Sequence, residues 1–263
     1  MGKILFIPGA DFSQNGIPSK FGISKNANAT KKIRTGVTAM GGNWNGVSWT
    51  NEVITPITFD KDGYAKVPDS FDLGESAIGA FACDTGSSSA APIGGDVVKI
   101  WNLSALDTSE VQTMLAMFAY NTELVSLIVP FNTEKLNDCQ QLFRGCAKLE
   151  KLDLSTWTIG HHHNSQRMFQ GCSALKEIKF GEGYNPVSAG YDSNTFNGCT
   201  NLADIYAPAV TASEYQTSGT GAYVLVTNLT GLADSGTCPI ITIHCANGAK
   251  LVYTKAENTW AVE

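Results

Sequence analysis

The chain has 263 residues, of which 43% are hydrophobic and 10% aromatic, and it carries a net charge of −6. This length is enough for one large core or for two domains, and the 26 glycines favour strands and turns over a helical bundle. The charge is acidic and shows no basic stripe, which argues against nucleic acid as a partner. No apolar run approaches the roughly 18–20 residues of a membrane span.

The first 30 residues predict an N-terminal arm or cap. A short strand is expected at residues 3–7, followed by a polar stretch rich in Gly and Asn. The segment Gly9-Ala10-Asp11-Phe12-Ser13 resembles a short opening segment in virion proteins of phages that infect Bacteroidales. The apolar run at residues 4–7 is too short for the core of a signal peptide. We therefore expect either a protein that is not secreted by that route or one whose leader lies outside this sequence.

Residues 31–95 predict a small antiparallel β module. Asn45-Gly46 is a strong hairpin signal, and strand-like residues at 52–67 run out and return around a turn. Trp44 and Trp49 are candidates for an aromatic platform that binds sugar. The alternative is that both side chains pack within the hairpin, which is the more common role of such residues.

Residues 96–210 are organised by a repeated phrase. Phe118, Phe143, Phe169 and Phe196 follow one another at steps of 25, 26 and 27 residues. A period of this size is typical of stacked supersecondary units. We expect each Phe to fill the core from a single helical or 3₁₀ turn, each following Gly to leave that turn with positive φ, and each Cys to be small and buried. These scaffold positions are Phe143, Gly145, Cys146, Phe169, Gly171, Cys172, Phe196, Gly198 and Cys199.

A short strand follows each phrase, with the pattern L-x-x-L-x-L at residues 149–154 and L-x-x-I-x-F at residues 175–180. Successive residues of a strand point to opposite faces, so the residues between the apolar ones form an outer face. Neighbouring strands there place opposite charges side by side, which favours either a recognition face or a plain solvated surface. The candidate residues on this face are Lys151, Asp153, Glu177, Lys179, Asp204 and Tyr206.

The motif D-T-S-E-V-Q-T-M-L-A-M-F at residues 107–118 adds a second signature. With the Gly-Cys phrases and Leu152-Asp153-Leu154-Ser155, it closely resembles the BspA-like leucine-rich repeats of Bacteroidales and their phages, over roughly residues 95–210. The resemblance implies a right-handed solenoid of about four to five coils with a parallel sheet on one face. A strand at residues 97–100 would form the first, capping coil, with Ile100 lying 27 residues before Leu127 and in phase with it.

Two insertions break the repeat pattern, at residues 160–164 and 183–194, and both are expected to be exposed loops. The first contains His161, His162 and His163, a candidate contact cluster. Consecutive residues of an extended loop point in alternating directions, so the three would be poor joint metal ligands. The repeated cysteines are expected to point the same way, which disfavours disulfides among them.

Residues 211–263 predict a C-terminal β cap, a meander of strands at 240–244, 251–254 and 259–262. The expected fold class is therefore mainly β with short helical turns. It is a leucine-rich-repeat right-handed solenoid flanked by an N-terminal small antiparallel β module and a C-terminal β-meander cap. The four expected segments are 1–30, 31–95, 96–210 and 211–263.

The sequence contains no catalytic motif, cofactor-binding loop or metal-ligand spacing of a known kind, so we expect a non-enzymatic protein without cofactor or metal. The first hypothesis is a phage virion surface protein (fibre, tail or capsid decoration) that assembles in the host cytoplasm. Its partners would be other copies of itself, virion proteins, or a host surface glycan or protein. The alternative is a BspA-like adhesin, secreted or on the bacterial cell surface, which would require a leader. A carbohydrate-active enzyme is a remote alternative, since a folded surface can bring two carboxylates together.

Overall fold

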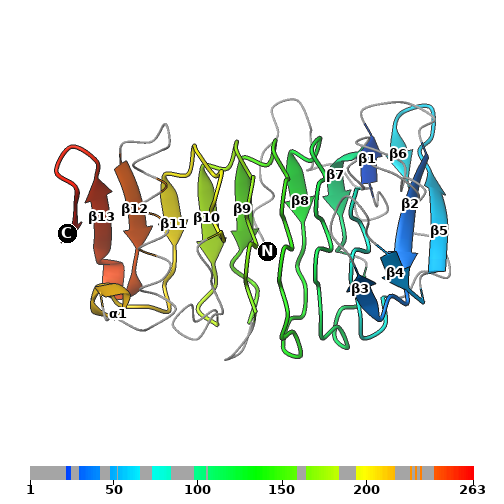
Figure 1. Cartoon of the computed structure of the whole chain (residues 1–263), viewed down its shortest axis with the longest axis horizontal. Helices are drawn as coiled ribbons and strands as arrows, with labels where there is room; N and C mark the ends of the chain where they lie inside the picture. The colour runs from blue at the N-terminus through cyan, green and yellow to red at the C-terminus, as the bar shows by residue number, and fades with distance from the viewer. Residues whose placement is uncertain are drawn as a thin grey trace.

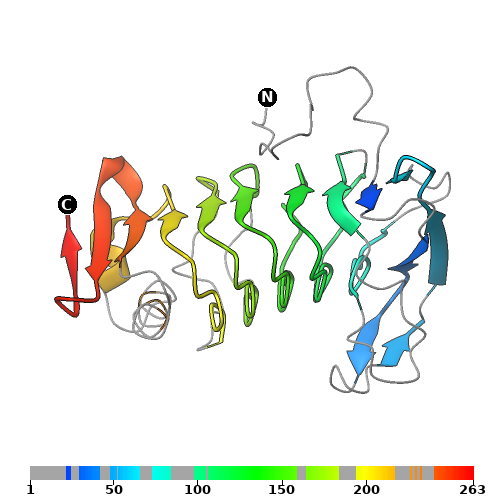
Figure 2. The ribbon, with the colours of Figure 1, turned by 90° about the horizontal axis from the view of Figure 1, so that it is seen from above.

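A computed structural model describes residues 22–24, 30–41, 48–51, 53–65, 73–83, 98–104, 106–158, 164–183, 194–216 and 240–263, together with Val226, Leu229 and Leu232. Strands β7 to β13 lie side by side along the long axis, and β1 to β6 gather at one end (Figure 1). The view from above shows successive coils, each running from the sheet to an opposite wall and back (Figure 2). The expected segments at 3–7, 9–13, 45–46 and 184–193 lie outside the described residues.

The N-terminal strands form short antiparallel pairs, as expected. β2 pairs with β5, β3 pairs with β4, and β1 lies between β6 and the first strand of the solenoid, β7. The strands of this part are β1 (Gly22–Ser24), β2 (Thr30–Thr35), β3 (Ala39–Gly41), β4 (Ser48–Thr50), β5 (Val53–Thr58) and β6 (Tyr64–Ala65).

The sheet side of the solenoid consists of parallel strands, one per coil. β7 pairs in parallel with β8, and β9 to β12 form a second parallel run, which β13 and β14 continue in antiparallel order. The predicted mainly β solenoid with a C-terminal meander is therefore confirmed. The elements are β7 (Val98–Asn102), β8 (Ser126–Ile128), β9 (Lys151–Leu154), β10 (Glu177–Phe180), β11 (Asp204–Tyr206), α1 (Ala212–Gln216), β12 (Ile240–His244), the 3₁₀ helix η3 (Ala246–Gly248), β13 (Lys250–Thr254) and β14 (Thr259–Val262).

The wall opposite the sheet is a run of turns in each coil, where we expected a single helical or 3₁₀ turn. Backbone N–H groups alternate between two kinds of acceptor: Phe118 donates to Leu142 of the next coil (2.9 Å), whereas Ala119 donates to Ala116 within its own coil (3.0 Å). Ala116 and Tyr120 have positive φ angles (55° and 59°), and a right-handed helix cannot continue through such residues. This is why the wall forms turns and not a helix. The wall therefore ties the coils together along the axis.

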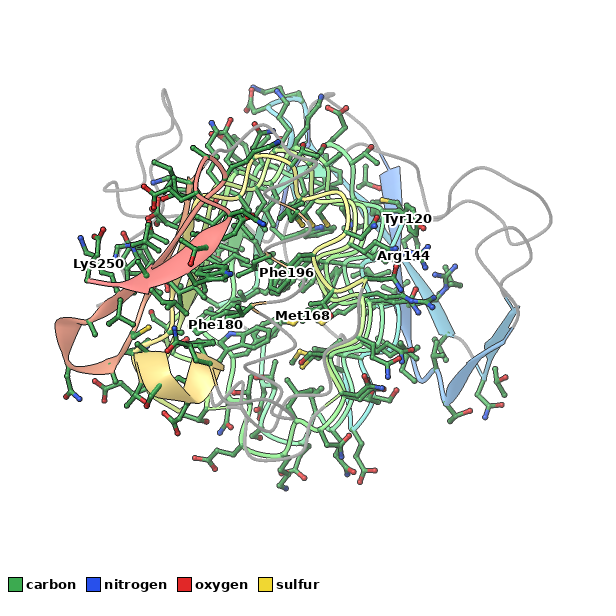
Figure 3. The ribbon with its side chains drawn as sticks, turned by 60° about the vertical axis from the view of Figure 1, so that its left-hand side comes forward. Tyr120, Arg144, Met168, Phe180, Phe196 and Lys250 are labelled. Carbon is green, nitrogen blue, oxygen red and sulfur yellow. The ribbon has the colours of Figure 1, made fainter. Side chains whose placement is uncertain are left out.

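Stacked phenylalanines fill the space between sheet and wall. The rings of Phe81, Phe118, Phe143, Phe169 and Phe196 follow one another with centroid separations of 5.5, 5.6, 5.9 and 5.3 Å, and all five are buried. Viewed obliquely to the long axis, labelled core residues lie between the sheet side and the turn wall (Figure 3). The predicted role of the repeated Phe as a core plug is confirmed.

Phe81 shows that the stack begins earlier in the chain than the Phe repeat indicated. Residues 73–83 form a further wall segment, in which the Phe81 N–H donates to the Met117 carbonyl at 2.8 Å. The step from Phe81 to Phe118 is 37 residues, well outside the 25–27 of the later coils. This wall segment lies within the stretch that the sequence assigned to the small β module.

The first solenoid strand pairs one residue out of the expected phase. Trp101, rather than Ile100, lies opposite Leu127, and Ile100 lies opposite Ser126. Trp101 occupies the inner position opposite Leu127. Its side chain is fully buried, and its ring centroid lies 4.9 Å from that of Phe81. The expected pairing of Ile100 with Leu127 is therefore wrong by one residue.

Candidate functional site

The outer face of the sheet brings the predicted polar residues into two rows. In the first row, Lys151 lies opposite Glu177, which lies opposite Asp204 on the next strand. In the second row, Asp153, Lys179 and Tyr206 follow in the same order. These rows match the predicted alternation because β9, β10 and β11 pair in parallel without a slip in register.

Charged contacts join the first two strands of this face. Glu177 accepts from Lys151 Nζ at 3.2 Å and lies 3.6 Å from Lys179 Nζ, so its carboxylate lies between two ammonium groups. The Glu177 side chain is 18% exposed, against 46% for Lys151 and 40% for Lys179. Asp153 lies beside Lys179 in register, but its Oδ1 accepts from the Ser155 N–H at 3.0 Å. This local turn directs the Asp153 carboxylate along its own strand end.

The face continues onto the C-terminal cap through His244, which sequence analysis did not select. The Tyr206 and His244 rings stack with centroids 4.1 Å apart and planes 4° from parallel. His244 Nε2 lies 2.9 Å from Asp204 Oδ1, and Lys179 Nζ lies 5.5 Å from the Tyr206 ring centroid. We call this connected set the polar strip; its members are Lys151, Glu177, Lys179, Asp204, Tyr206 and His244.

A sequence signal for His244 does exist. In the run Ile240 to His244, Ile241 and Ile243 are fully buried, so Thr242 and His244 face outward by simple alternation. What the sequence could not show was that β12 joins the solenoid sheet directly after β11. The 33 residues between Tyr206 and Ile240 contain no repeat phrase that would set this register.

The geometry of the strip determines which contacts it offers. β10 and β12 flank β11, so one face of the Tyr206 ring is directed towards Lys179 and the other towards His244. Both ring faces are therefore occupied, which leaves ring edges, a hydroxyl group and alternating charges for a partner. Such a surface suits hydrogen bonds and ion pairs better than the stacking of a sugar ring.

Other candidate residues can be compared with the strip only in part. His161, His162, His163 and Trp44 lie outside the described residues, and for Trp49 only the backbone in β4 is described. Among the described residues, no group of three or more His, Cys, Asp or Glu side chains is arranged to hold a metal ion. The described residues also contain no helix long and apolar enough to cross a bilayer.

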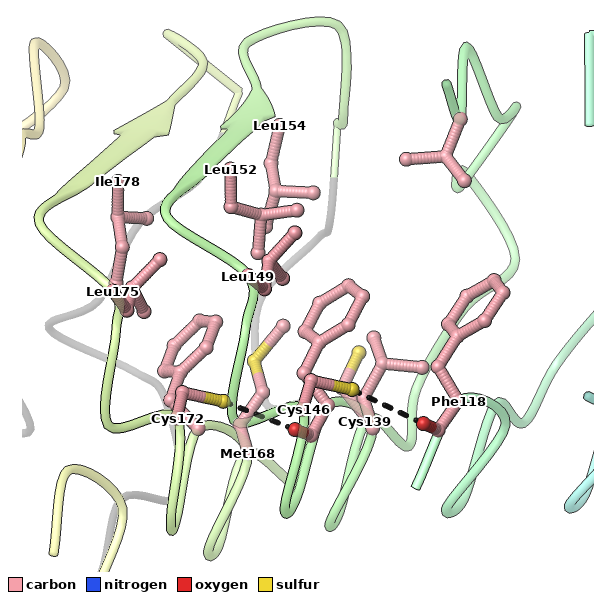
Figure 4. Close-up of a cluster of buried hydrophobic side chains, with 14 of the residues drawn as sticks. Phe118, Cys139, Cys146, Leu149, Leu152, Leu154, Met168, Cys172, Leu175 and Ile178 are labelled. Carbon is pink, nitrogen blue, oxygen red and sulfur yellow. Dashed lines mark hydrogen bonds between the residues drawn. The ribbon is translucent and has the colours of Figure 1, made fainter. Parts of the chain in front are cut away.

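The repeated cysteines Cys146, Cys172 and Cys199 are all buried. Figure 4 shows Cys146 and Cys172 on successive coils of the turn wall. Cys146 Sγ donates to the carbonyl oxygen of Phe118 (3.2 Å), one coil earlier, and Cys172 makes the same contact with Phe143 (3.0 Å). Burial raises the pKa of the Cys146 thiol well above its ordinary value, and the neighbouring Cys172 adds to the effect. A thiol held protonated in this way is a packing group and a weak donor rather than a nucleophile.

Comparison with known proteins supports the repeat assignment. Residues 95–205 match the family model described as "Mycoplasma protein of unknown function, DUF285", which covers less than half of the chain. This match is consistent with the BspA-like repeat character predicted for the same stretch. Searches of curated proteins and of solved structures returned no match.

Proposed function

We propose that this chain is a non-enzymatic recognition protein in which the repeat scaffold presents the polar strip to a protein or glycan partner. The observation that carries the proposal is the unbroken chain of contacts from Lys151 to His244 across four strands. Packing alone does not require polar side chains on this outer face to contact one another in sequence. Held together, they form a preorganised surface that loses little side-chain entropy when a partner binds.

We place this function on the surface of a phage virion, as a fibre, tail or capsid-decoration component that forms homo-oligomers. The support is the resemblance of residues 9–13 to virion proteins of Bacteroidales phages. A bacterial cell-surface or secreted adhesin is the second candidate, favoured by the BspA-like repeats and the matching family model. Genes for capsid or tail proteins beside the coding sequence would support the virion, and a leader in the complete reading frame would support the adhesin.

Charge reversal on the strip tests the recognition role. The variant Lys151→Glu/Lys179→Glu replaces the two ammonium groups beside Glu177 by two carboxylates, so that three carboxylates lie next to one another. Lys135→Glu/Lys148→Glu is a matched control, because it makes the same change in net charge at two exposed lysines outside the strip. Each of these lysines makes an equivalent ion pair between coils, Lys135 with Glu110 at 2.6 Å and Lys148 with Glu123 at 2.8 Å. Exposed pairs of this kind contribute only about 0–1 kcal/mol, so both variants should fold.

The assay is the binding of fluorescently labelled protein to intact bacterial cells and to an array of bacterial surface glycans. We expect the strip variant to lose at least about tenfold in affinity, the equivalent of ~1.4 kcal/mol, while Lys135→Glu/Lys148→Glu binds like the wild type. Equal binding by the strip variant would exclude this face as the binding surface. Release of sugar from the arrayed glycans by the wild-type protein would instead favour the carbohydrate-active alternative.

A further inference from the structure

The side chain of Lys31, on strand β2, lies inside the protein. It is 0% exposed, and its Nζ donates to the carbonyl oxygen of Ala82 at 2.9 Å and to Cys83 Sγ at 3.2 Å. Burying an ammonium group costs free energy unless a counter-charge compensates for it. Neither of these acceptors is a carboxylate, so a thiolate at Cys83 is the counter-charge that this contact can supply.

The sulfur of Cys83 is placed differently from those of the repeated cysteines. Cys146, Cys172 and Cys199 each donate from Sγ to a backbone carbonyl oxygen one coil earlier, at 3.2, 3.0 and 3.0 Å. Such a contact uses the thiol proton and keeps the sulfur in its less reactive form. Cys83 Sγ instead accepts from an amine, and a hydrogen bond from a cation favours the thiolate, which is the form that peroxides oxidise.

The contact joins two segments that are far apart in the sequence. Lys31 and Cys83 are 52 residues apart, and β2 lies at the end of the molecule where the solenoid begins (Figure 1). The Arg34 N–H of β2 donates to the Ala80 carbonyl oxygen at 2.9 Å, and the Cys83 N–H donates to Ala119 of the next coil at 2.9 Å. A covalent bond between the two side chains would therefore fasten β2 to the first wall segment of the solenoid.

We propose that Lys31 and Cys83 are the site of an oxidative crosslink that forms when a peroxide reaches the contact. The O–O bond of the peroxide breaks and one oxygen atom passes to Cys83 Sγ, which gives a sulfenic acid and, from hydrogen peroxide, one water molecule. The neutral amine of Lys31 then attacks this oxidised sulfur. An N–S bond forms, the S–O bond breaks, and the hydroxyl group leaves with an amine proton as a second water molecule. One thiol, one amine and one hydrogen peroxide thus give one sulfenamide and two water molecules.

The geometry of the contact suits the attack of the amine on the sulfur. The separation of 3.2 Å between Lys31 Nζ and Cys83 Sγ lies within the roughly 3–3.5 Å of a near-attack arrangement. The hydrogen bond to the Ala82 carbonyl oxygen holds the nitrogen beside the sulfur, and the flexible lysine stem lets it close to bonding distance. Because both side chains are buried, dissolved thiols are kept away from the sulfenic acid while the amine reacts.

Peptide mapping after peroxide treatment tests the crosslink. The folded protein is treated with hydrogen peroxide, the excess is removed with catalase, and the chain is unfolded in urea with iodoacetamide and no reductant. We expect Cys83 to escape alkylation and its peptide to be joined to that of Lys31, about 2 Da below the sum of the two free peptides. Dithiothreitol should separate them. Cys172, which is equally buried but contacts a carbonyl oxygen, is the internal control and should remain fully alkylated.

Two variants show whether the amine is required. Lys31→Met replaces the amine with an unbranched apolar side chain that fills the same space, and in this variant Cys83 should stay open to alkylation. The absence of joined peptides from the treated wild type would overturn the proposal, whether or not Lys31→Met folds. Equal loss of alkylation at Cys83 in the wild type and in Lys31→Met would overturn it as well.

The crosslink should also stabilise the fold, because it closes a long loop in the unfolded chain. Peroxide-treated wild type should unfold at a higher urea concentration than untreated protein, and dithiothreitol should reverse the shift. Cys83→Ser, which cannot form the bond, should unfold at the same urea concentration before and after treatment. An unchanged midpoint in crosslinked wild type would show that the bond does not fasten β2 to the wall.

Discussion

Two glycines of the wall, Gly145 and Gly171, share a backbone conformation but differ in their surroundings. Their φ angles are 74° and 79°. A methyl group added at Gly171 would lie 3.5 Å from Gly145 Cα, an ordinary contact. A methyl group added at Gly145 would lie 2.8 Å from Cδ1 of the Tyr120 ring. Gly171→Ala therefore perturbs the backbone alone, whereas Gly145→Ala also creates a clash.

The two costs differ by an amount that can be worked out. A left-handed backbone costs a residue with a Cβ about 1–2 kcal/mol, so Gly171→Ala should lower the free energy of unfolding by that amount. Gly145→Ala carries the same cost plus about 1–3 kcal/mol for overpacking against the ring. The ring atoms near the new methyl group include Cγ at 3.3 Å, close to the Tyr120 backbone, so the ring cannot simply swing away.

Urea denaturation of single and double variants measures the difference. In a Tyr120→Ala background the clash is absent, so Gly145→Ala should cost about as much as Gly171→Ala does in the wild type. The coupling free energy between residues 120 and 145 should therefore be about 1–3 kcal/mol. Equal costs for the two glycine substitutions in the wild type, or no coupling with Tyr120, would refute the reasoning.

Two further predictions concern the core. Phe143→Ala removes a fully buried ring between two stacked neighbours and should lower the free energy of unfolding by about 3–5 kcal/mol in urea denaturation. A loss below about 1 kcal/mol would mean that the stacked phenylalanine rings contribute little to stability. Burial raises the pKa of Cys245 from 9.0 to about 11, so its thiol stays protonated in the fold at a pH where the unfolded chain has lost the proton. The stabilisation from this pKa shift is complete below pH 9.0 and declines as the pH rises towards about 11. Between these pH values the free energy of unfolding of Cys245→Ala should therefore fall less than that of the wild type. Parallel pH profiles of the two proteins would contradict the raised pKa.

The scaffold is predictable because each coil repeats one packing arrangement. Phe143 and Phe169 recur because each ring stacks on the ring of the preceding coil. Cys146 recurs as Cys172 because a small donor must reach the Phe carbonyl oxygen one coil earlier. In the coil of Phe118, Asn121 stands where the later coils have Cys, and its side-chain amide donates to the Phe81 carbonyl oxygen at 2.8 Å. The repeat period and the burial of the thiols could therefore be predicted from the sequence alone.

The start of the solenoid was harder to predict because it departs from the period. The wall segment with Phe81 precedes Phe118 by 37 residues, so a search at 25–27 residues misses it. It also lacks the Gly-Cys pair: Cys83 lies two residues after the Phe rather than three, and it accepts from the buried Lys31 amine at 3.2 Å. The first wall segment contacts the N-terminal strands where later coils contact another coil. Different residues therefore make its hydrogen bonds and fill its core positions.

For the outward residues of the polar strip, the sequence predicts the position of a side chain but not why that residue type stands there. Lys151 and Glu177 could be placed by alternation because the buried residues beside them set the register. Their chemical identity is not set by the repeat, since no core contact constrains an outward side chain. The strip also crosses from the repeats into the cap, where His244 stacks on Tyr206 and Lys250 lies next in the row. A surface of this kind belongs to the sheet rather than to the repeat unit, so further contact residues should be sought along the strand register and not along the repeat period.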